Sequence, residues 1–253
     1  MSEPLLEARG IVKRFGTVEA LRGADFTVLP GEVVALIGDN GAGKSTLVKT
    51  LSGIQVHDEG EVLFEGKAVS IPSPVAAREL GIETVYQDLA LAPELDPAAN
   101  LFLGREIVRS GPLGFFGFLD KAAMRQRTNE AFDSLGVKIQ DREATVATLS
   151  GGQRQGVAVG RAVTWASKVV FMDEPTAALG VDQTRNVLDL IRRTRDQGIS
   201  VVLISHNMPE VLEVSDRIEV LRLGERVAQF EAAQTSMEEL VGAMTGALGG
   251  DRG

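Results

Sequence analysis

The sequence contains no cysteine, few aromatic residues and no long apolar segment. Without cysteine the chain forms no disulfide bonds and no thiolate metal sites. No stretch approaches the roughly 18 consecutive apolar residues of a membrane-spanning helix, so we expect none. The N-terminus, MSEPLLEARG, lacks the basic and apolar regions of a signal peptide, so we expect a cytoplasmic protein.

The sequence also lacks clusters of lysine and arginine, and its formal net charge is -9. Nucleic-acid phosphates are bound by clustered basic side chains, so this acidic balance argues against nucleic acid as a main partner. Hydrophobic residues make up 44% of the 253 residues and charged residues 24%, which is ordinary for a globular protein. This length suits one large α/β domain, or a core with a small subdomain.

Short apolar runs alternate with amphipathic patterns along most of the chain. Four runs rich in Val, Ile or Leu predict buried strands, at 31–38, 81–87, 168–174 and 199–206. Such nearly continuous apolar runs are typical of parallel strands that helices cover on both faces. Apolar residues at helical spacing predict a helix over 182–196. The fold class is therefore α/β, with a mainly parallel sheet.

Other segments indicate antiparallel structure. The stretches 24–30 and 61–70 are expected to be strands of an antiparallel β layer, and 217–230 is expected to form a hairpin. Ser236 and Glu239 have the spacing of a capping box, which predicts the start of a last helix.

The segment from about 90 to 160 differs, because it shows helical patterns without a strand signal. We interpret it as a helical subdomain inserted into a core of residues 1–89 and 161–253. The Gly- and Phe-rich stretch 110–118 is expected to be a surface loop, with a partner contact as the alternative. No internal repeat is present, so 1–253 is predicted to be a single nucleotide-binding domain.

The glycine-rich sequence GDNGAGKS follows the first apolar run and precedes a helical pattern, which is the context of a phosphate-binding P-loop. Glycines let the backbone wrap around phosphates, while the amides of the helix N-terminus point at the anion. Lys44 is expected to reach the β- and γ-phosphates, and the Ser45 hydroxyl to bind Mg²⁺. The predicted nucleotide-binding residues of this loop are Gly38, Asp39, Asn40, Gly41, Ala42, Gly43, Lys44, Ser45 and Thr46.

Two carboxylates, Asp173 and Glu174, follow the apolar strand VVFM directly. In P-loop enzymes an aspartate at the end of a neighbouring strand completes the Mg²⁺ shell. Glu174 would then lie beside the γ-phosphate, where a carboxylate can polarise an attacking water. The alternative is a solvated strand end, but two carboxylates in tandem before Pro175 favour the catalytic interpretation.

Three further features accompany these motifs in a fixed order. Gln87 follows a predicted strand, LSGGQ occupies 149–153, and His206 ends another predicted strand. In this order and spacing, over nearly its whole length, the chain resembles the ATP-binding subunits of ABC transporters. LSGGQ with its flanking motifs is far more specific than any one of these motifs.

The resemblance implies a role for LSGGQ, which has neither a metal ligand nor a nucleophile–base pair. In this family two nucleotide domains pair head to tail, and each ATP lies between the P-loop of one and the LSGGQ of the other. Ser150, Gly151, Gly152 and Gln153 would then bind the γ-phosphate of a partner's ATP, at the start of a helix. A chain with one copy of each half is expected to pair with a second copy of itself.

The resemblance also assigns roles to single residues. Phe15 would stack on adenine, with an ordinary core phenylalanine as the alternative. Gln87 would contact Mg²⁺ or water and link to the helical subdomain, and His206 would lie near the γ-phosphate. The catalytic assignments are Glu174, His206 and Gln87, and the Mg²⁺ ligands are Ser45, Gln87 and Asp173.

One stretch departs from the family pattern. The family usually has Ser-Ala-Leu-Asp after DEPT, whereas residues 177–180 read Ala-Ala-Leu-Gly, so the loop aspartate is missing. We expect Asp182 to cap the following helix instead. EPTAALG and GQRQGVAVGRAV together are similar to the carbohydrate importer branch, in which many members fuse two nucleotide domains.

The resemblance thus implies an ATPase subunit that powers ribose- or fructose-type sugar import. It would act through transmembrane permease subunits on the cytoplasmic side of a bacterial inner membrane, and indirectly with a periplasmic sugar-binding protein. The alternatives are import of a non-sugar ligand, an ABC ATPase outside transport, and a regulatory module that binds ATP without turnover.

Overall fold

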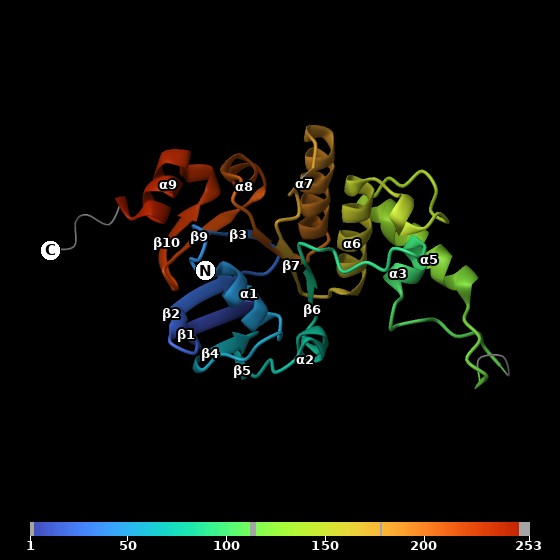
Figure 1. Ribbon diagram of the computed structural model, residues 1–253, viewed down its shortest axis with the longest axis horizontal. Helices are drawn as coiled ribbons and strands as arrows, with labels where there is room; N and C mark the ends of the chain where they lie inside the picture. Colours follow the sequence, from blue (N-terminus) through green and yellow to red (C-terminus); the bar gives the residue numbers. More distant parts are fainter. Residues whose placement is uncertain (1–2, 112–114, 178, 248–253) are drawn as a thin grey trace.

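The computed structural model describes residues 3–111, 115–177 and 179–247 (Figure 1). Its central element is a six-stranded sheet with the order β10-β9-β3-β8-β7-β6. Neighbouring strands from β9 to β6 run parallel, and β10 pairs antiparallel with β9 at the edge. The strands are β3 Val33–Ile37, β6 Ile82–Val85, β7 Val169–Asp173, β8 Ser200–Ile204, β9 Arg217–Arg222 and β10 Glu225–Glu231. All four predicted buried strands are confirmed with slightly shorter bounds, and the predicted hairpin is confirmed with its second strand ending one residue later, at Glu231.

A second sheet of four antiparallel strands has the order β2-β1-β4-β5. The strands are β1 Leu6–Phe15, β2 Val18–Val28, β4 Glu59–Phe64 and β5 Lys67–Val69. The predicted antiparallel layer is confirmed, but the sequence analysis missed β1 and the first half of β2. The pairing of β1 with β2 shifts register between Ala8 and Ile11, and such a bulge breaks the two-residue alternation that identifies a strand.

The helices lie around the six-stranded sheet, and α3 and α5 lie at the end of the molecule away from α9 (Figure 1). They are α1 Lys44–Leu51, α2 Pro74–Glu79, α3 Pro97–Leu101, α5 Lys121–Leu135, α6 Gly151–Trp165, α7 Val181–Asp196, α8 Met208–Val214 and α9 Met237–Thr245, with 3₁₀ turns at Val146–Thr148 and Ala232–Gln234. The segment proposed as a helical subdomain contains α3, α5 and most of α6. Its boundary at 160 falls inside α6 and stays a prediction.

The N-termini of two helices test the capping predictions. At α9 the Ser236 amide donates to Glu239 (2.8 Å) and the Glu239 amide to the Ser236 hydroxyl (3.3 Å), which confirms the capping box. At α7 the expectation for Asp182 is wrong. The N-cap is Gly180, whose amide donates to the Gln183 side chain (3.4 Å), and Asp182 lies in the first turn. Ala178 lies outside the described residues.

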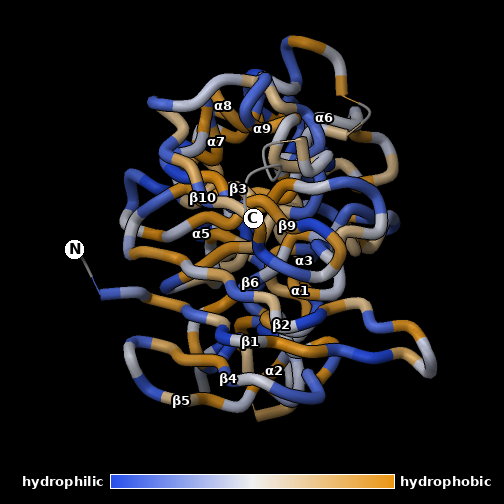
Figure 2. The backbone as a smooth tube through the Cα atoms, turned by 90° about the vertical axis from the view of Figure 1, so that its left-hand side faces the viewer, coloured by the Kyte–Doolittle hydropathy of each residue, from blue (hydrophilic) through white to orange (hydrophobic). Residues whose placement is uncertain are grey.

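Apolar side chains pack on both faces of the central sheet. One cluster joins β7 and β8 to α5, α6 and α7, and a second fills the space between the two sheets and around α1. In Figure 2 the central strand β3 is hydrophobic, whereas the outer loops carry many hydrophilic segments. No helix of the described residues combines the length and the apolar character that crossing a bilayer requires.

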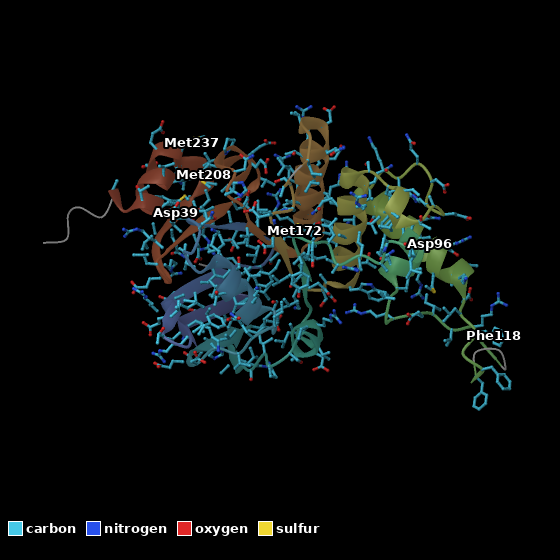
Figure 3. All side chains as sticks on the ribbon, in the orientation of Figure 1. Asp39, Asp96, Phe118, Met172, Met208 and Met237 are labelled. Atoms are coloured by element: carbon cyan, nitrogen blue, oxygen red, sulfur yellow. The ribbon has the colours of Figure 1, made fainter. Side chains whose placement is uncertain are left out.

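The described part of the loop 110–118 lies at the surface, as predicted. Phe115, Phe116 and Phe118 are exposed, and Phe118 lies at the far tip of the helical end of the molecule (Figure 3). Pro112, Leu113 and Gly114 lie outside the described residues.

Phe132 and Phe116 provide a matched test of the packing between α5 and α6. The Phe132 ring is fully buried and lies so close to Gly160 that a Cβ there would come within 2.7 Å of it. We expect Phe132→Ala to lower the free energy of unfolding by about 3–5 kcal/mol, measured by urea denaturation. The control Phe116→Ala, on the exposed loop, should stay within about 0.5 kcal/mol. Equal losses in the two variants would contradict this packing.

Candidate functional site

The P-loop connects β3 to α1 in the way the sequence predicts. Gly43 caps α1 in a left-handed conformation (φ 104°), and a Cβ on Gly38 would overlap the carbonyl oxygen of Leu221. Both positions therefore require glycine. The Lys44 ammonium folds back and donates to the carbonyl oxygens of Gly38 (2.6 Å) and Asp39 (3.1 Å). The loop is thus closed around its own lysine, and the first amides of α1 have no partner within the helix.

A cavity of about 480 Å³ lies at this loop. Seven of the nine predicted P-loop residues line it, namely Asn40, Gly41, Ala42, Gly43, Lys44, Ser45 and Thr46. Asp39 instead closes the loop, because its carbonyl oxygen accepts from the Ala42 amide (3.0 Å), and Gly38 lies buried at the end of β3.

The sequence analysis missed the other wall of this cavity, which comes from Val18, Glu19, Ala20 and Arg22 of β2 and from Leu223 of the β9–β10 turn. Val18 and Leu223 are apolar yet exposed (63% and 61%). No local motif marks these residues, since the contact depends on how the two sheets meet. The only sequence signal for this wall is that Val18 lies three residues after Phe15, the residue predicted to stack on adenine.

Phe15 ends β1 and pairs in register with Val18 across the β1–β2 turn. The ring is 51% exposed, so the alternative of a core phenylalanine is wrong. The Lys13 ammonium lies 5.7 Å from the ring centroid. Phe15 therefore presents an aromatic ring next to a wall residue of the P-loop cavity, and its stacking on adenine stays a prediction.

The acidic pair lies at the carboxyl end of β7, beside the end of β8. Glu174 has a left-handed backbone (φ 49°), which costs a side-chain residue about 1–2 kcal/mol. Its amide donates to the Ile204 carbonyl (2.9 Å), and its carboxylate lies 2.8 Å from Nδ1 of His206. The Glu174 side chain is largely buried, whereas that of His206 is exposed. This strained turn brings two predicted catalytic residues into contact.

Charges of both signs meet at this edge of the sheet. Burial raises the pKa of Asp173, and the charge of Glu174 raises it further, while Lys44 lowers it. Burial lowers the pKa of Lys44, and Glu174, Asp39 and Asp173 act in the opposite direction. The lysine of the P-loop and the carboxylates of β7 are therefore close enough to share one electrostatic environment.

The residues predicted to hold Mg²⁺ fit a hard divalent cation. The described residues include no group of three His, Cys, Asp or Glu side chains that could hold a metal alone. Mg²⁺ in nucleotide sites needs only one or two carboxylates, with phosphates and water as the other ligands. Asp173 is half-buried beside a second carboxylate, and both its burial and the charge of Glu174 raise its pKa, so a cation at this place would offset an unfavourable negative charge. Oxygen donors at Ser45, Gln87 and Asp173 suit this ion.

Gln87 is exposed in the turn that follows β6, the strand next to β7. This turn is closed by the Leu89 amide, which donates to the Tyr86 carbonyl (2.9 Å). Gln87 thus lies at the same edge of the sheet as Asp173 and Glu174, since the carboxyl ends of parallel strands share one edge.

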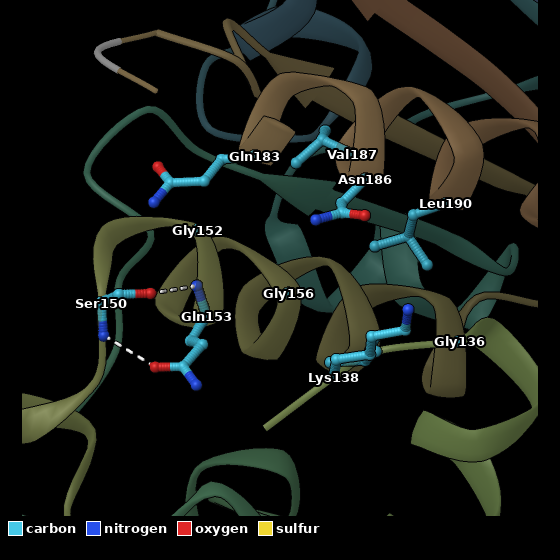
Figure 4. Close-up of a pocket in the computed structure, with 11 residues that line it drawn as sticks. Gly136, Lys138, Ser150, Gly152, Gln153, Gly156, Gln183, Asn186, Val187 and Leu190 are labelled. Atoms are coloured by element: carbon cyan, nitrogen blue, oxygen red, sulfur yellow. Dashed lines mark hydrogen bonds between the residues drawn. The ribbon is translucent and has the colours of Figure 1, made fainter. Parts of the chain in front are cut away.

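LSGGQ forms the N-terminus of α6 (Figure 4). Ser150 is the N-cap, and its amide donates to the Gln153 side chain (2.9 Å) while the Gln153 amide donates to its hydroxyl (3.3 Å). Gly152 faces Gln183 of α7, where a Cβ would come within 2.9 Å of that side chain. The reciprocal bonds fix the orientation of the first amides of α6.

Residues of LSGGQ and of the P-loop face two different cavities. A cavity of about 120 Å³ lies between α6, α7 and the segment after α5, and Ser150, Gly152 and Gln153 line it (Figure 4). It shares no lining residue with the P-loop cavity. Within the described chain, therefore, the structure brings together the P-loop with Asp173 and Glu174, but it does not bring LSGGQ to them.

These features define a P-loop nucleotide-binding fold. A family model described as "ABC transporter" matches residues 21–177. The chain is 55% identical to the fructose import ATP-binding protein FrcA of Rhizobium meliloti, over 97% of this chain and 95% of the relative. It is 48% identical to the xylose/arabinose import ATP-binding protein XylG of Sulfolobus acidocaldarius, over 95% of this chain and 94% of the relative.

A longer relative and two solved structures are also similar to this chain. The chain is 45% identical to the ribose import ATP-binding protein RbsA 1 of Rubrobacter xylanophilus over 96% of its length, but spans only 47% of that relative. A nucleotide-free ATP-binding cassette from an ABC transporter superposes with a TM-score of 0.79 and a cassette in its ADP conformation with 0.80, each at 28% identity and 96% coverage of both chains.

The chain therefore belongs to the ABC transporter family, as one of its ATPase cassettes, and its nucleotide is ATP. The predicted fold class is confirmed, including the antiparallel layer and the inserted helices.

The half-buried charge of Asp173 predicts opposite effects on stability and activity. Because its pKa is raised in the folded chain, ionisation destabilises the fold at neutral pH, and this cost disappears as the pH falls to the ordinary carboxyl range near ~4. We expect Asp173→Asn to raise the Tm of the nucleotide-free protein at pH 7, to match the wild type at low pH, and to lose Mg²⁺-dependent hydrolysis. A lower Tm at pH 7 would contradict the assignment. Calorimetry across pH measures the first effect, and phosphate release measures the second.

Proposed function

We propose that this chain is the ATP-hydrolysing subunit that powers sugar import through membrane permease subunits. The observation that carries the proposal is the high identity, over nearly the whole chain, to ATP-binding proteins named for fructose and xylose/arabinose import. Relatives named for ribose import add further support. These named substrates are all sugars, which favours sugar import over the import of other ligands or a role outside transport.

The separation of the two cavities supports action as a head-to-tail dimer. Ser150, Gly151, Gly152 and Gln153 lie away from the P-loop of their own chain, so they serve the P-loop of a second copy. The N-terminus of α6 supplies a hydroxyl and first-turn amides, which bind the γ-phosphate of that copy's ATP. Twofold symmetry then gives two equal sites.

Each site hydrolyses ATP with groups from β7 and β8. Water attacks the γ-phosphorus, Glu174 accepts its proton, and the bond to the β–γ bridging oxygen breaks to leave ADP and phosphate. His206, 2.8 Å from that carboxylate, orients it and lies near the γ-phosphate. Lys44 neutralises charge on the β- and γ-phosphates, and Phe15 stacks on adenine. Ser45, Gln87 and Asp173 would hold Mg²⁺, which would supply positive charge to stabilise the phosphate oxygens.

The remaining parts of the chain connect hydrolysis to transport. Residues 1–89 and 161–253 form the core, and 90–160 form a helical subdomain. The Gln87 turn and this subdomain accept a cytoplasmic helix of the permease on the cytoplasmic side of a bacterial inner membrane. A periplasmic sugar-binding protein delivers the substrate, which does not contact this chain.

Replacing Glu174 separates ATP binding from turnover. In Glu174→Gln the neutral amide cannot accept the proton, so we expect turnover to fall roughly 10²- to 10⁴-fold while ATP binding persists. The dimer with ATP should then accumulate, measured by sedimentation together with phosphate release. Adding Ser150→Arg, which blocks the phosphate site at LSGGQ, should abolish this dimer while the monomer still binds ATP. Normal turnover by Glu174→Gln would remove that residue from the base role.

Sugar import is tested with the permease that copurifies with the chain, reconstituted in vesicles with its periplasmic binding protein. We expect ATP-dependent uptake of labelled fructose, ribose or xylose, and loss of uptake with Glu174→Gln. Hydrolysis that couples to a non-sugar ligand, with no uptake of any of these sugars, would overturn the sugar assignment and leave the ATPase assignment intact.

A further inference from the structure

Arg161 ties the helix that carries LSGGQ to the turn that carries Gln87. Its guanidinium, on α6, donates through Nη1 to the Ala90 carbonyl (2.8 Å) and through Nη2 to the Leu89 carbonyl (2.9 Å). The bonds join residues that lie more than 70 positions apart in the sequence. Arg161 and LSGGQ belong to the same continuous helix, α6, whose N-cap is Ser150.

The turn that Arg161 contacts has an unusual backbone. Leu89 (φ 60°) and Ala90 (φ 45°) are consecutive left-handed residues, and neither is glycine. Side-chain residues rarely adopt this conformation, and they keep it only where surrounding contacts enforce it. The Leu89 side chain packs against the apolar cluster that joins β7 and β8 to α5, α6 and α7. Its amide closes the turn on the Tyr86 carbonyl. The Arg161 bonds act on the opposite, carbonyl side of the same two residues.

A guanidinium is suited to this contact. Its planar fork can donate two parallel hydrogen bonds to neighbouring carbonyl oxygens, and it stays charged even where burial lowers its pKa, as it does for Arg161. The ammonium of a lysine donates from a single nitrogen, so it cannot form the same pair of parallel hydrogen bonds.

The C-terminal end of α6 also holds the strand that precedes Gln87. Arg105 pairs with Glu83 of β6 (2.6 Å) and stacks over Trp165, the last residue of α6, with 4.7 Å between the guanidinium carbon and the ring centroid. The chain on both sides of Gln87 is therefore attached to one helix.

We propose that Arg161 is a positioning residue. Through its bonds to Leu89 and Ala90, it makes the position of Gln87 depend on the position of α6. The inference rests on the proposed function, because there the N-terminus of α6 binds the partner's ATP. When that γ-phosphate draws Ser150 toward it, the helix moves as a rigid element and carries the carbonyls of Leu89 and Ala90 with it. Gln87 then reaches the Mg²⁺ side of its own site only in the closed dimer.

A double-mutant cycle between Arg161 and Gln87 tests this coupling. We expect Arg161→Met to lower kcat roughly ten- to a hundredfold with the KM for ATP within about twofold, since a misplaced group affects turnover more than binding. Gln87→Ala should cause a similar loss, and the double variant should be no slower than Gln87→Ala alone. Arg161→Lys keeps the charge without the fork and should lie between wild type and Arg161→Met.

The matched control is Arg125→Met, which removes an arginine of α5 that pairs with Glu143 (2.9 Å) and should leave kcat unchanged. Hydrogen exchange of residues 86–91 without ATP gives a readout independent of activity, and we expect faster exchange in Arg161→Met and partial protection in Arg161→Lys. Additive losses, a rise in KM alone, or unchanged exchange would overturn the proposal. Absence of hydrolysis by the wild type would instead contradict the proposed function and leave the exchange test valid.

Discussion

The register between β7 and β8 is the constraint on which the site depends. Asp173 is paired with Ile204, and the Glu174 amide continues this ladder by one bond to the Ile204 carbonyl. Both strands therefore end at the same level. Glu174, one residue beyond the end of β7, and His206, two residues beyond the end of β8, then meet at 2.8 Å. A slip of one residue would point each side chain to the other face and separate them. Hydrophobic burial of both strands keeps this register.

Stability and function compete at this edge of the sheet. Asp173 and Lys44 are held partly out of water, which disfavours the charged form of each, and Glu174 adopts a strained backbone. Such features persist only where a rigid scaffold enforces them. The packed strands provide that scaffold, and a nucleotide with its cation would compensate the charges of these side chains.

The sequence predicts the buried strands and the position of the P-loop between β3 and α1, because continuous apolar runs and a glycine-rich loop are local signals. It misses β1, where a bulge interrupts the alternation, and it assigns the wrong N-cap to α7, since Gly180 with Gln183 replaces a side-chain cap on Asp182. It also misses Val18 and Leu223, whose place at the cavity depends on contact between two sheets. The tie between Arg161 and the Gln87 turn has no local signal either, because it depends on tertiary packing.

The apolar rim of the P-loop cavity has a consequence for how salt acts on this protein. Phe15, Val18 and Leu223 all leave more than half of their surface in water. A purine ring laid over them would release that water, and salt does not screen this gain. The phosphates, by contrast, bind through charges that salt screens. Raising the salt concentration should therefore weaken binding of the phosphates far more than binding of the base. The preference for ATP over ADP should then be lost at a lower salt concentration than the affinity for adenine.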